Sequence, residues 1–363
     1  MIKRKIDNYI KQYYKNSKNA LLITGARQIG KTYSIRRFGQ SFKHFIEINF
    51  VEQPDAVKIF DHAKNSQDIL LRLSALTATP LVKDETLIFF DEVQRCPDLV
   101  TAIKFLVDEG SYRYILSGSL LGVELKDLRS EPVGYLGIKD MYPLDFEEFI
   151  SAIGIKPAII EALREAWRNR TPVDAFVHDK LMELFRLYLV VGGMPAAVDQ
   201  YIKSNNLQNV LTVQQDIIRL YKRDIAQYDP DNKLYIGEIF NLIPPELNAK
   251  NKRFILKRLN ENAKFNRIQN SFLWLAHAGV ALPVYNVEEP KTPLLLARSR
   301  NLFKLFLNDI GLLASQYGLS AATKPSTSGP FTKTPWRRNW WRTVLPLTFI
   351  TIRNGGSWIS SLN

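Results

Sequence analysis

The segment GARQIGKT, at residues 25–32, constrains the fold of this 363-residue chain more than any other part of its sequence. Two glycines are separated by four residues and followed by a lysine and a hydroxyl residue, between an apolar run, LLIT, and a stretch with helical spacing, YSIRRFG. Glycines let backbone amides approach an anion closely, and the N-terminus of a helix attracts negative charge. The segment therefore predicts a P-loop that wraps a polyphosphate between a strand and a helix.

Each residue of this loop has an expected contact with ATP. Backbone amides would surround the phosphates, Lys31 would reach the β- and γ-phosphates, and the hydroxyl of Thr32 would ligate magnesium. The predicted nucleotide-binding residues are Gly25, Ala26, Arg27, Gln28, Ile29, Gly30, Lys31 and Thr32, with Asp91 from a later segment. The alternative is a glycine-rich turn that binds nothing, and the complete motif in this context argues against it.

The segment LIFFDE, residues 87–92, predicts the second half of the site. Its apolar run indicates a buried strand that ends in Asp91, whose carboxylate would hold magnesium through water, as in a Walker B motif. Glu92 follows directly and is placed to polarise an attacking water as a general base. Acidic residues are common at strand ends, but this pair follows the P-loop by about 60 residues with a strand and helices between, which favours the functional interpretation.

The next apolar run, Tyr112–Leu116, ends in Ser-Gly-Ser. Hydroxyl groups there would face the γ-phosphate beside the Walker B strand, so Ser117 or Ser119 is a candidate sensor. We assign Ser119 to the predicted catalytic set, with Lys31 and Glu92. Serine and glycine also end strands because they suit turns, and that alternative stays open.

Short apolar runs alternate with helical patterns along the first 150 residues. Uninterrupted β-rich runs of this length are typical of a parallel sheet that helices cover on both faces. The runs occupy residues 20–24, 45–50, 87–90 and 112–116. They predict an α/β fold in which the parallel sheet of a P-loop NTPase is sandwiched by helices.

The pattern changes beyond this region. From about Phe146 to Tyr228 it is almost wholly helical, with breaks at Gly192, Gly193 and Pro195. The helical stretches LYIGEIFNLI and KRFILKRLNENAKF then precede FLWLAHAGVALPVYNV, an order compatible with a winged-helix-like unit of helices followed by a hairpin. The predicted parts are an ATPase domain at 1–150, a mostly helical domain at 151–230, a winged-helix-like domain at 231–320 and an atypical tail at 321–363.

The composition of the chain bears on its cellular location and on its binding partners. The single cysteine cannot form an internal disulfide, no apolar signal region follows the basic N-terminus, and no apolar stretch reaches the roughly 18 residues of a membrane span, so we predict a cytoplasmic protein. The net charge of +13 favours an anionic partner such as nucleic acid. Six of the basic residues, however, lie among the last 40 positions of the chain. Without them the chain has 43 basic and 36 acidic residues, so a basic, solvated surface with no nucleic-acid partner is an equal alternative.

The sequence gives little support for a second metal site, a reactive cysteine or guanine recognition. The four histidines show no metal-ligand spacing and Cys96 has no His or Cys partner nearby, so we predict no metal beyond magnesium and an inert thiol. Guanine recognition would require an Asn-Lys-x-Asp element, and residues 232–235, Asn-Lys-Leu-Tyr, lack the aspartate. A small-molecule kinase stays an alternative, although the Asp-Glu pair and the sensor-like strand are more typical of hydrolases.

With these motifs the chain resembles a large prokaryotic group of AAA-superfamily ATPases. The resemblance is carried, between residues 1 and about 320, by GARQIGKT, LIFFDEVQRCPDLVTAIKFLVD, YILSGSLLG, MYPLDFEEF, YLVVGGMPAAV and KLFLNDIGLLASQYG. It implies an AAA-like ATPase core, a helical and winged-helix-like middle of unknown function, and a C-terminal domain similar to restriction-endonuclease folds. It also implies a cytoplasmic ATPase whose substrate is unknown.

The sequence departs from that family at two places. Relatives carry an arginine in a Leu-x-Gly-Arg turn after the sensor strand, where this chain has SEPVGYLG and only Arg129 as a substitute, so a trans-acting arginine stays unassigned. After Asp309 no acidic residue occurs in 54 positions, which excludes the carboxylate cluster of a metal-dependent nuclease from the tail. We hypothesise that residues from about Lys324 onward are translated out of frame, because shifted codons for residues 328–333 and 356–363 can spell family-like acidic segments; a disordered end is the alternative.

Together these residues predict an ATP-binding protein that acts as a magnesium-dependent AAA-like ATPase and couples hydrolysis to movement of its helical domain. The alternative is a nucleotide-gated switch with little hydrolysis, in which the winged-helix-like region grips DNA or a protein. The expected partners are therefore ATP and, at that region, DNA or a protein, but no membrane. The oligomeric state is left open.

Overall fold

The computed structural model describes residues 2–63, 65–118, 134–228, 233–249, 254–255, 259, 265–287, 298–317 and 348–350. The chain divides into two compact units. The first consists of Lys3–Tyr142 together with His277–Gly279, and the second holds Pro143–Ala276 and the part of the chain from Val280 onward. Both segments of the predicted nucleotide site belong to the first unit.

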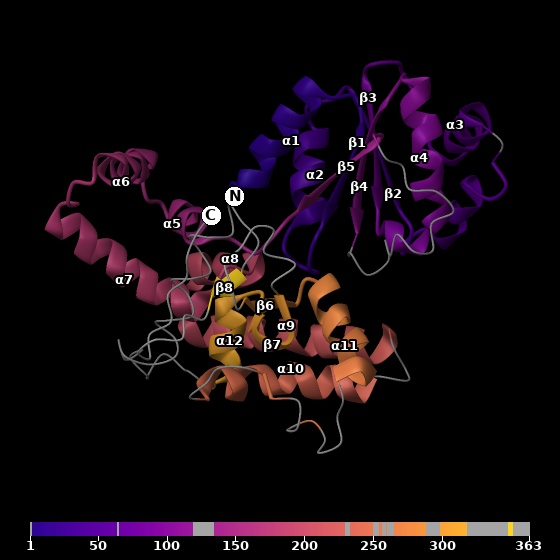
Figure 1. Ribbon diagram of the computed structural model, residues 1–363. Coiled ribbons are helices and arrows are strands. Elements are labelled where there is room, and N and C mark those ends of the chain that lie inside the picture. The colour runs from indigo at the N-terminus through magenta and orange to yellow at the C-terminus, as the bar shows by residue number, and fades with distance from the viewer. Residues whose placement is uncertain are drawn as a thin grey trace. The chain divides into compact units, whose positions relative to one another are not determined.

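A parallel sheet of five strands forms the centre of the first unit (Figure 1). The strands are β1 (Ala20–Thr24), β2 (His44–Asn49), β3 (Thr86–Asp91), β4 (Arg113–Gly118) and β5 (Leu136–Asp140), in the spatial order β2-β3-β4-β1-β5. Neighbouring strands are parallel throughout, with Leu21 opposite Ile115 and Ile46 opposite Ile88. The carboxyl ends of β1, β3 and β4 therefore lie at one edge of the sheet, where the loops that follow them begin.

Helices cover both faces of this sheet, as Figure 1 shows. On one face lie α1 (Lys5–Asn16) and α2 (Lys31–Gly39), and on the other α3 (Ser66–Leu76) and α4 (Pro97–Glu109). Short 3-10 turns follow two strands, η1 (Pro54–Ile59) after β2 and η2 (Val93–Arg95) after β3. Every residue of β1 and β3 is buried, as expected for strands between two helical layers. The predicted P-loop sheet sandwiched by helices is confirmed.

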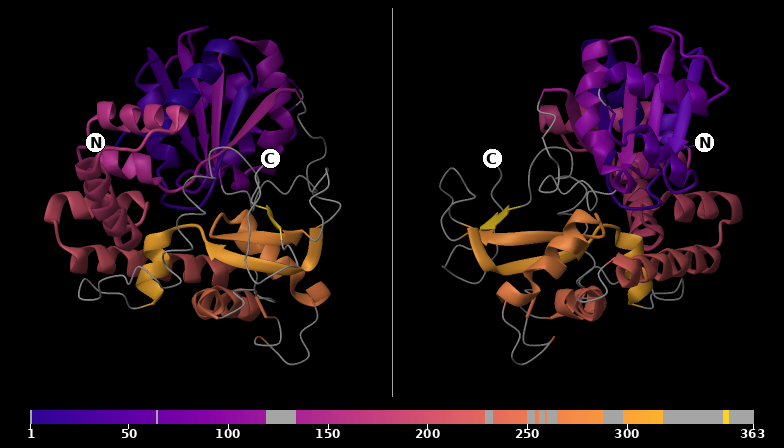
Figure 2. Two further views of the ribbon diagram at one scale, coloured as in Figure 1. Left: turned by 60° about the vertical axis from the view of Figure 1, so that its left-hand side comes forward. Right: turned by 90° about the vertical axis from the view of Figure 1, so that its right-hand side faces the viewer.

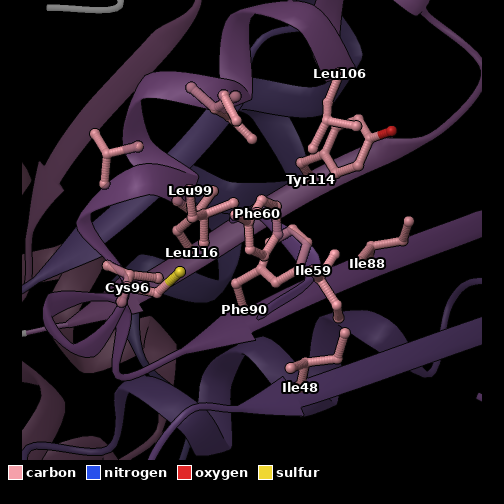
Figure 3. Close-up of a cluster of buried hydrophobic side chains, with 14 of the residues drawn as sticks. Ile48, Ile59, Phe60, Ile88, Phe90, Cys96, Leu99, Leu106, Tyr114 and Leu116 are labelled. Atoms are coloured by element: carbon pink, nitrogen blue, oxygen red, sulfur yellow. The ribbon is translucent and has the colours of Figure 1, made fainter. Parts of the chain in front are cut away.

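The face beneath α3 and α4 holds a continuous apolar core (Figure 3). Phe90 and Leu116, from the neighbouring strands β3 and β4, pack there with Leu99 of α4. The ring of Phe90 stacks on that of Tyr114 with centroids 6.5 Å apart. Cys96 lies in the same cluster, with 3% of its surface exposed. This packing fixes the strand ends at which the functional loops begin.

Strand β5 has no counterpart among the predicted apolar runs. Its sequence, LGIKD, carries only intermediate and exposed side chains, because the strand lies at the edge of the sheet with β1 as its neighbour. An edge strand can end a sheet with charged side chains that discourage further pairing. A search for uninterrupted apolar runs therefore could not detect it.

The second unit is mostly helical, as predicted. Its helices are α5 (Phe146–Ala152), α6 (Pro157–Asn169), α7 (Ala175–Val191), α8 (Pro195–Ser204), α9 (Leu207–Tyr228), α10 (Lys233–Asn248), α11 (Phe265–His277) and α12 (Ile310–Gln316). A small sheet accompanies them, in which β6 (Ala281–Val287) pairs antiparallel with β7 (Arg298–Leu307) and parallel with β8 (Thr348–Ile350), drawn in yellow in Figure 2. Within the described ranges no single helix is long and apolar enough to cross a bilayer. Only α7 and α8 taken together reach that length and apolar content, and the two helices are bent by 119° where they join.

The predicted winged-helix-like region contains α10, α11 and the β6–β7 pair. In the stretch FLWLAHAGVALPVYNV the first six residues end α11 and the last seven form β6. Most of KRFILKRLNENAKF lies outside the described residues, as does the tail apart from β8. The winged helix and the out-of-frame tail stay predictions.

The turn between α7 and α8 is hydrogen-bonded to the segment that precedes α12. The N–H of Gly193 donates to Oδ2 of Asp309 (2.6 Å), whose Oδ1 accepts from the N–H of Leu312 (2.9 Å) in the first turn of α12. A Cβ on Gly193 would lie 2.0 Å from the carbonyl oxygen of Leu144, and Gly192 has a φ of 74°. Only glycine fits at either position. We call Gly192, Gly193 and Asp309 the glycine–aspartate junction.

Candidate nucleotide-binding site

The loop between β1 and α2 has a backbone that requires glycine at two places. Gly25 has a φ of 139°, and a Cβ there would lie 2.2 Å from the carbonyl oxygen of Met141. Gly30, which precedes α2, is left-handed with a φ of 95°, and no side-chain hydrogen bond caps the helix there. The first-turn amides of a helix without such a cap can bind an anion. The loop thus forms a cradle that fits a polyphosphate.

Lys31, the first residue of α2, is directed at the loop itself. Its Nζ donates to the carbonyl oxygens of Gly25 and Ala26, both at 2.8 Å. Burial lowers the pKa of this ammonium group to about 8, and the negative charges of Glu92 and Asp91 partly oppose the shift. A phosphate that reaches the loop would therefore offer Lys31 an anionic partner in place of two neutral carbonyls.

Asp91 is the point at which four elements of the unit converge. Its Oδ2 accepts from the hydroxyl of Thr32 (3.0 Å) on α2 and from Nδ2 of Asn49 (3.3 Å) at the end of β2. Its Oδ1 accepts from the N–H of Glu92 (3.0 Å) and from the hydroxyl of Ser117 on β4. The residue is only 4% exposed. These four donors fix the orientation of the Asp91 carboxylate.

The donor atoms at this point are suited to a hard cation. Magnesium prefers oxygen ligands such as carboxylates and hydroxyls and commonly keeps several waters. The hydroxyl of Thr32 and the carboxylate of Asp91, the two residues predicted to hold magnesium, are in contact beside the loop. The residues present therefore fit a magnesium ion bound together with a nucleotide.

Glu92 lies directly after β3 in a left-handed conformation, with a φ of 58° and a ψ of 44°. Its Oε2 accepts a hydrogen bond from Nε2 of Gln94. Of the two carboxylates that raise the pKa of Lys31, Glu92 has the larger effect. The carboxylate predicted as the general base therefore lies near the P-loop lysine.

The two candidate sensor serines differ in what the structure describes. Ser117 is buried in β4, and its hydroxyl donates to Asp91. Ser119, the predicted sensor, lies outside the described residues, and so does Arg129, the candidate substitute for the missing arginine. The described serine thus supports the Walker B carboxylate, and the sensor assignment stays a prediction.

Two residues near the loop were missed by the sequence analysis. The guanidinium of Arg4, which is 8% exposed, donates to the carbonyl oxygens of Ile29 (2.8 Å) and Tyr142 (2.6 Å). The first of these bonds holds the backbone of the P-loop in place. Asn49 orients Asp91, as described above. Asn49 is the last residue of β2 as Asp91 is the last of β3, although the second apolar run was predicted to continue to Phe50; the shared position at a strand end was the available signal. Nothing in the basic segment MIKRK distinguishes Arg4 from its neighbours.

Cys96 is unsuited to chemistry at this site. Burial raises the pKa of its thiol to about 12, so that the thiol stays protonated. Over the part of the chain that is described, no group of three or more His, Cys, Asp or Glu could hold a metal ion.

Comparisons with known proteins agree with this site. Residues 17–150 match a family model described as an AAA domain, and residues 182–323 match one described as a domain of unknown function (DUF8612). No curated protein matches the chain. The AAA match spans the P-loop, Asp91 and Glu92, and it supports a P-loop domain of the AAA type that is expected to bind ATP.

One solved structure has a similar fold. The chain is similar to the Walker-type ATPase PABY2304 of Pyrococcus abyssi, with 13% identity, 87% of this chain and 96% of that chain covered, and a TM-score of 0.53. The Orc1 protein of Aeropyrum pernix in complex with DNA (15% identity, 87% and 91% covered) and PCH-2 of C. elegans (15% identity, 48% and 50% covered) also match, with TM-scores of 0.34 and 0.26. The first likeness shows the fold alone, and the other two carry no argument.

Proposed function

We propose that this chain binds ATP with magnesium at residues 25–32 and hydrolyses it. The observation that carries the proposal is the convergence on Asp91, where the hydroxyl that ends the P-loop motif meets the carboxylate that ends β3 at 3.0 Å. A loop that merely turned the chain would not need a buried carboxylate against its last hydroxyl residue. The AAA match over residues 17–150 supports the same chemistry.

Each group has a role that follows from its position. The loop amides and the ammonium group of Lys31 bind the phosphates and neutralise charge that develops during hydrolysis. Thr32 and Asp91 would hold magnesium, which would withdraw charge from the phosphates. Asn49 and Ser117 keep the Asp91 carboxylate oriented by hydrogen bonds to its two oxygens. Glu92 accepts the proton of an attacking water.

The variant Glu92→Gln tests hydrolysis. Removing a general base lowers the rate by about 100-fold or more, while an amide of the same shape leaves the loop and its phosphate contacts in place. Phosphate release should therefore fall by about that factor, with the affinity for ATP within about twofold of wild type. Glu165→Gln, an exposed glutamate of α6, serves as the matched control and should keep the wild-type rate. Equal phosphate release from wild type and Glu92→Gln, with both binding ATP, would leave the nucleotide-gated switch as the function.

We further propose that turnover moves the helical unit through the segment that joins the two units. Within the first unit the carbonyl oxygen of Met141 lies against Gly25 of the P-loop. Three residues later, within the second unit, the N–H of Leu144 donates to the carbonyl oxygen of Gly193 at 2.7 Å. Hydrogen exchange at Leu144 should therefore change on addition of ATP in wild type and not in Lys31→Ala. Identical exchange in both proteins would contradict the coupling.

A further inference from the structure

The turn that follows Glu92 brings a glutamine to the end of the neighbouring strand. Glu92 starts the short turn η2, but its carboxylate does not cap that turn. Instead the side chain accepts a hydrogen bond from Gln94, two residues further along. A left-handed conformation at a residue other than glycine or asparagine costs on the order of 1 kcal/mol, so the surrounding contacts must hold Glu92 in place.

The same glutamine fills the space that Gly118 leaves empty. A Cβ on Gly118, the last residue of β4, would lie 2.8 Å from Oε1 of Gln94 and 3.1 Å from Cγ2 of Val93. The backbone of Gly118 is not left-handed, so a side chain there would be limited by space alone and would require the amide of Gln94 to move. One amide side chain thus lies against the end of β4 and donates to the carboxylate after β3.

We propose that Gln94 is a positioning residue for the ATPase reaction, which holds the carboxylate of Glu92 toward the P-loop through its contact with the end of β4. This inference rests on the proposed hydrolysis. A general base acts only within hydrogen-bond reach of the water it deprotonates, and a displacement of about 1 Å can cost up to about 100-fold in rate. With one carboxylate oxygen bound to Gln94, the other is left to orient the water. In this role Gln94 acts through Glu92 and not on the nucleotide directly.

Two substitutions at Gln94 measure this role. Gln94→Ala should lower kcat about tenfold, because Glu92 loses its fixed orientation, with KM for ATP within about twofold because the phosphate contacts remain. Gln94→Glu has the same shape but accepts hydrogen bonds and repels Glu92, so its kcat should fall further, toward that of Glu92→Gln. Gln67→Ala, at an exposed glutamine of α3, is the control and should match wild type. Wild-type kcat in Gln94→Glu, or a raised KM with unchanged kcat in Gln94→Ala, would overturn the proposal.

A double-mutant cycle with Gly118 tests the contact with β4. Gly118→Ala places a methyl group where the amide of Gln94 lies and should lower kcat several-fold by displacing it. In the Gln94→Ala background that space is free, so the second substitution should add less than about a twofold loss. Full additivity of the two losses would show that Gly118 and Gln94 act separately and would contradict the proposal.

The wild type and Glu92→Gln distinguish a failure of the positioning role from a failure of the proposed hydrolysis. Phosphate release by wild type and its loss in Glu92→Gln establish hydrolysis independently of Gln94. If those two results hold and the Gln94 variants turn over at the wild-type rate, only the positioning role fails. A wild type that releases no phosphate overturns hydrolysis and the positioning role together.

Discussion

The P-loop of the first unit and the glycine–aspartate junction of the second are both glycine-containing motifs, but their polar groups are used differently. At the junction, both oxygens of Asp309 accept from backbone amides of the same unit. At the P-loop, the start of α2 lacks a side-chain cap, and Lys31 donates only to carbonyls of its own loop. In both motifs the glycines leave room for another group close to the backbone. At the junction that group belongs to the chain itself, whereas the uncapped amides at the start of α2 could accept a ligand.

The largest expected effect lies at the junction. Gly193→Ala would place a Cβ 2.0 Å from the carbonyl oxygen of Leu144, which must move, and the free energy of unfolding should fall by about 3 kcal/mol. Chemical denaturation measures this loss. The affinity of the folded variant for ATP should stay within about twofold of wild type, and a selective loss of ATP binding would assign the junction a part in the nucleotide site.

A substitution in the P-loop should lower the affinity for ATP and leave the stability of the fold nearly unchanged. Lys31→Ala removes the ammonium group that we propose to contact the phosphates, and affinity for ATP should drop about 100-fold, or about 2.7 kcal/mol. Titration with a fluorescent ATP analogue measures the drop. Stability should change by less than about 1 kcal/mol, because the unfavourable burial of this group outweighs the attraction of Glu92 and Asp91 in its lowered pKa. Unaltered affinity would remove the basis of the proposed function.

A smaller loss is expected at the carboxylate of the junction. Asp309→Asn keeps the shape but retains only one acceptor oxygen for two amide donors, so one buried N–H loses its partner and stability should fall by about 2 kcal/mol. Thermal and chemical denaturation both report it. Asp216→Asn, at an exposed aspartate of α9, is the control and should be neutral within about 0.5 kcal/mol. Equal stability of the two variants would show that the junction carries no charge-assisted bond.

The smallest effect concerns pH. The pKa of Lys31 is lowered to about 8 by burial, and bound phosphates favour its charged form. Below pH 8 the lysine already carries its proton; above it, ATP binding requires proton uptake, so affinity should fall by up to about tenfold per pH unit. Titrations between about pH 7 and pH 9.5 measure this slope. Lys31→Ala should lack it, and an equally steep slope in that variant would assign it to another group.

The parts of the first unit that sequence could predict are those determined by local pattern. The P-loop is one continuous segment, and β1 to β4 lie at the four predicted strand segments, so spacing along the chain was sufficient. Asp91 could be predicted because a buried strand ends there. β5 could not, since its position at the sheet edge removes the apolar run on which the prediction depends.

The remaining residues depend on contacts between distant positions. Arg4 acts on carbonyl oxygens 25 and 138 positions away, and no local signal encodes such a pair. The junction likewise joins Gly193 to Asp309 across 116 positions. The breaks in the helical pattern were visible at Gly192 and Gly193, but the pattern gave no indication of the aspartate that meets them.

The burial of Cys96 has a practical consequence for experiments on this protein. It is the single cysteine of the chain, and a thiol with a pKa of about 12 hardly reacts with maleimides near neutral pH. New cysteines on exposed positions of α3 and α7 could therefore carry a pair of spectroscopic labels without removal of the native one. Such a pair would test whether the two units move when ATP is added to the chain.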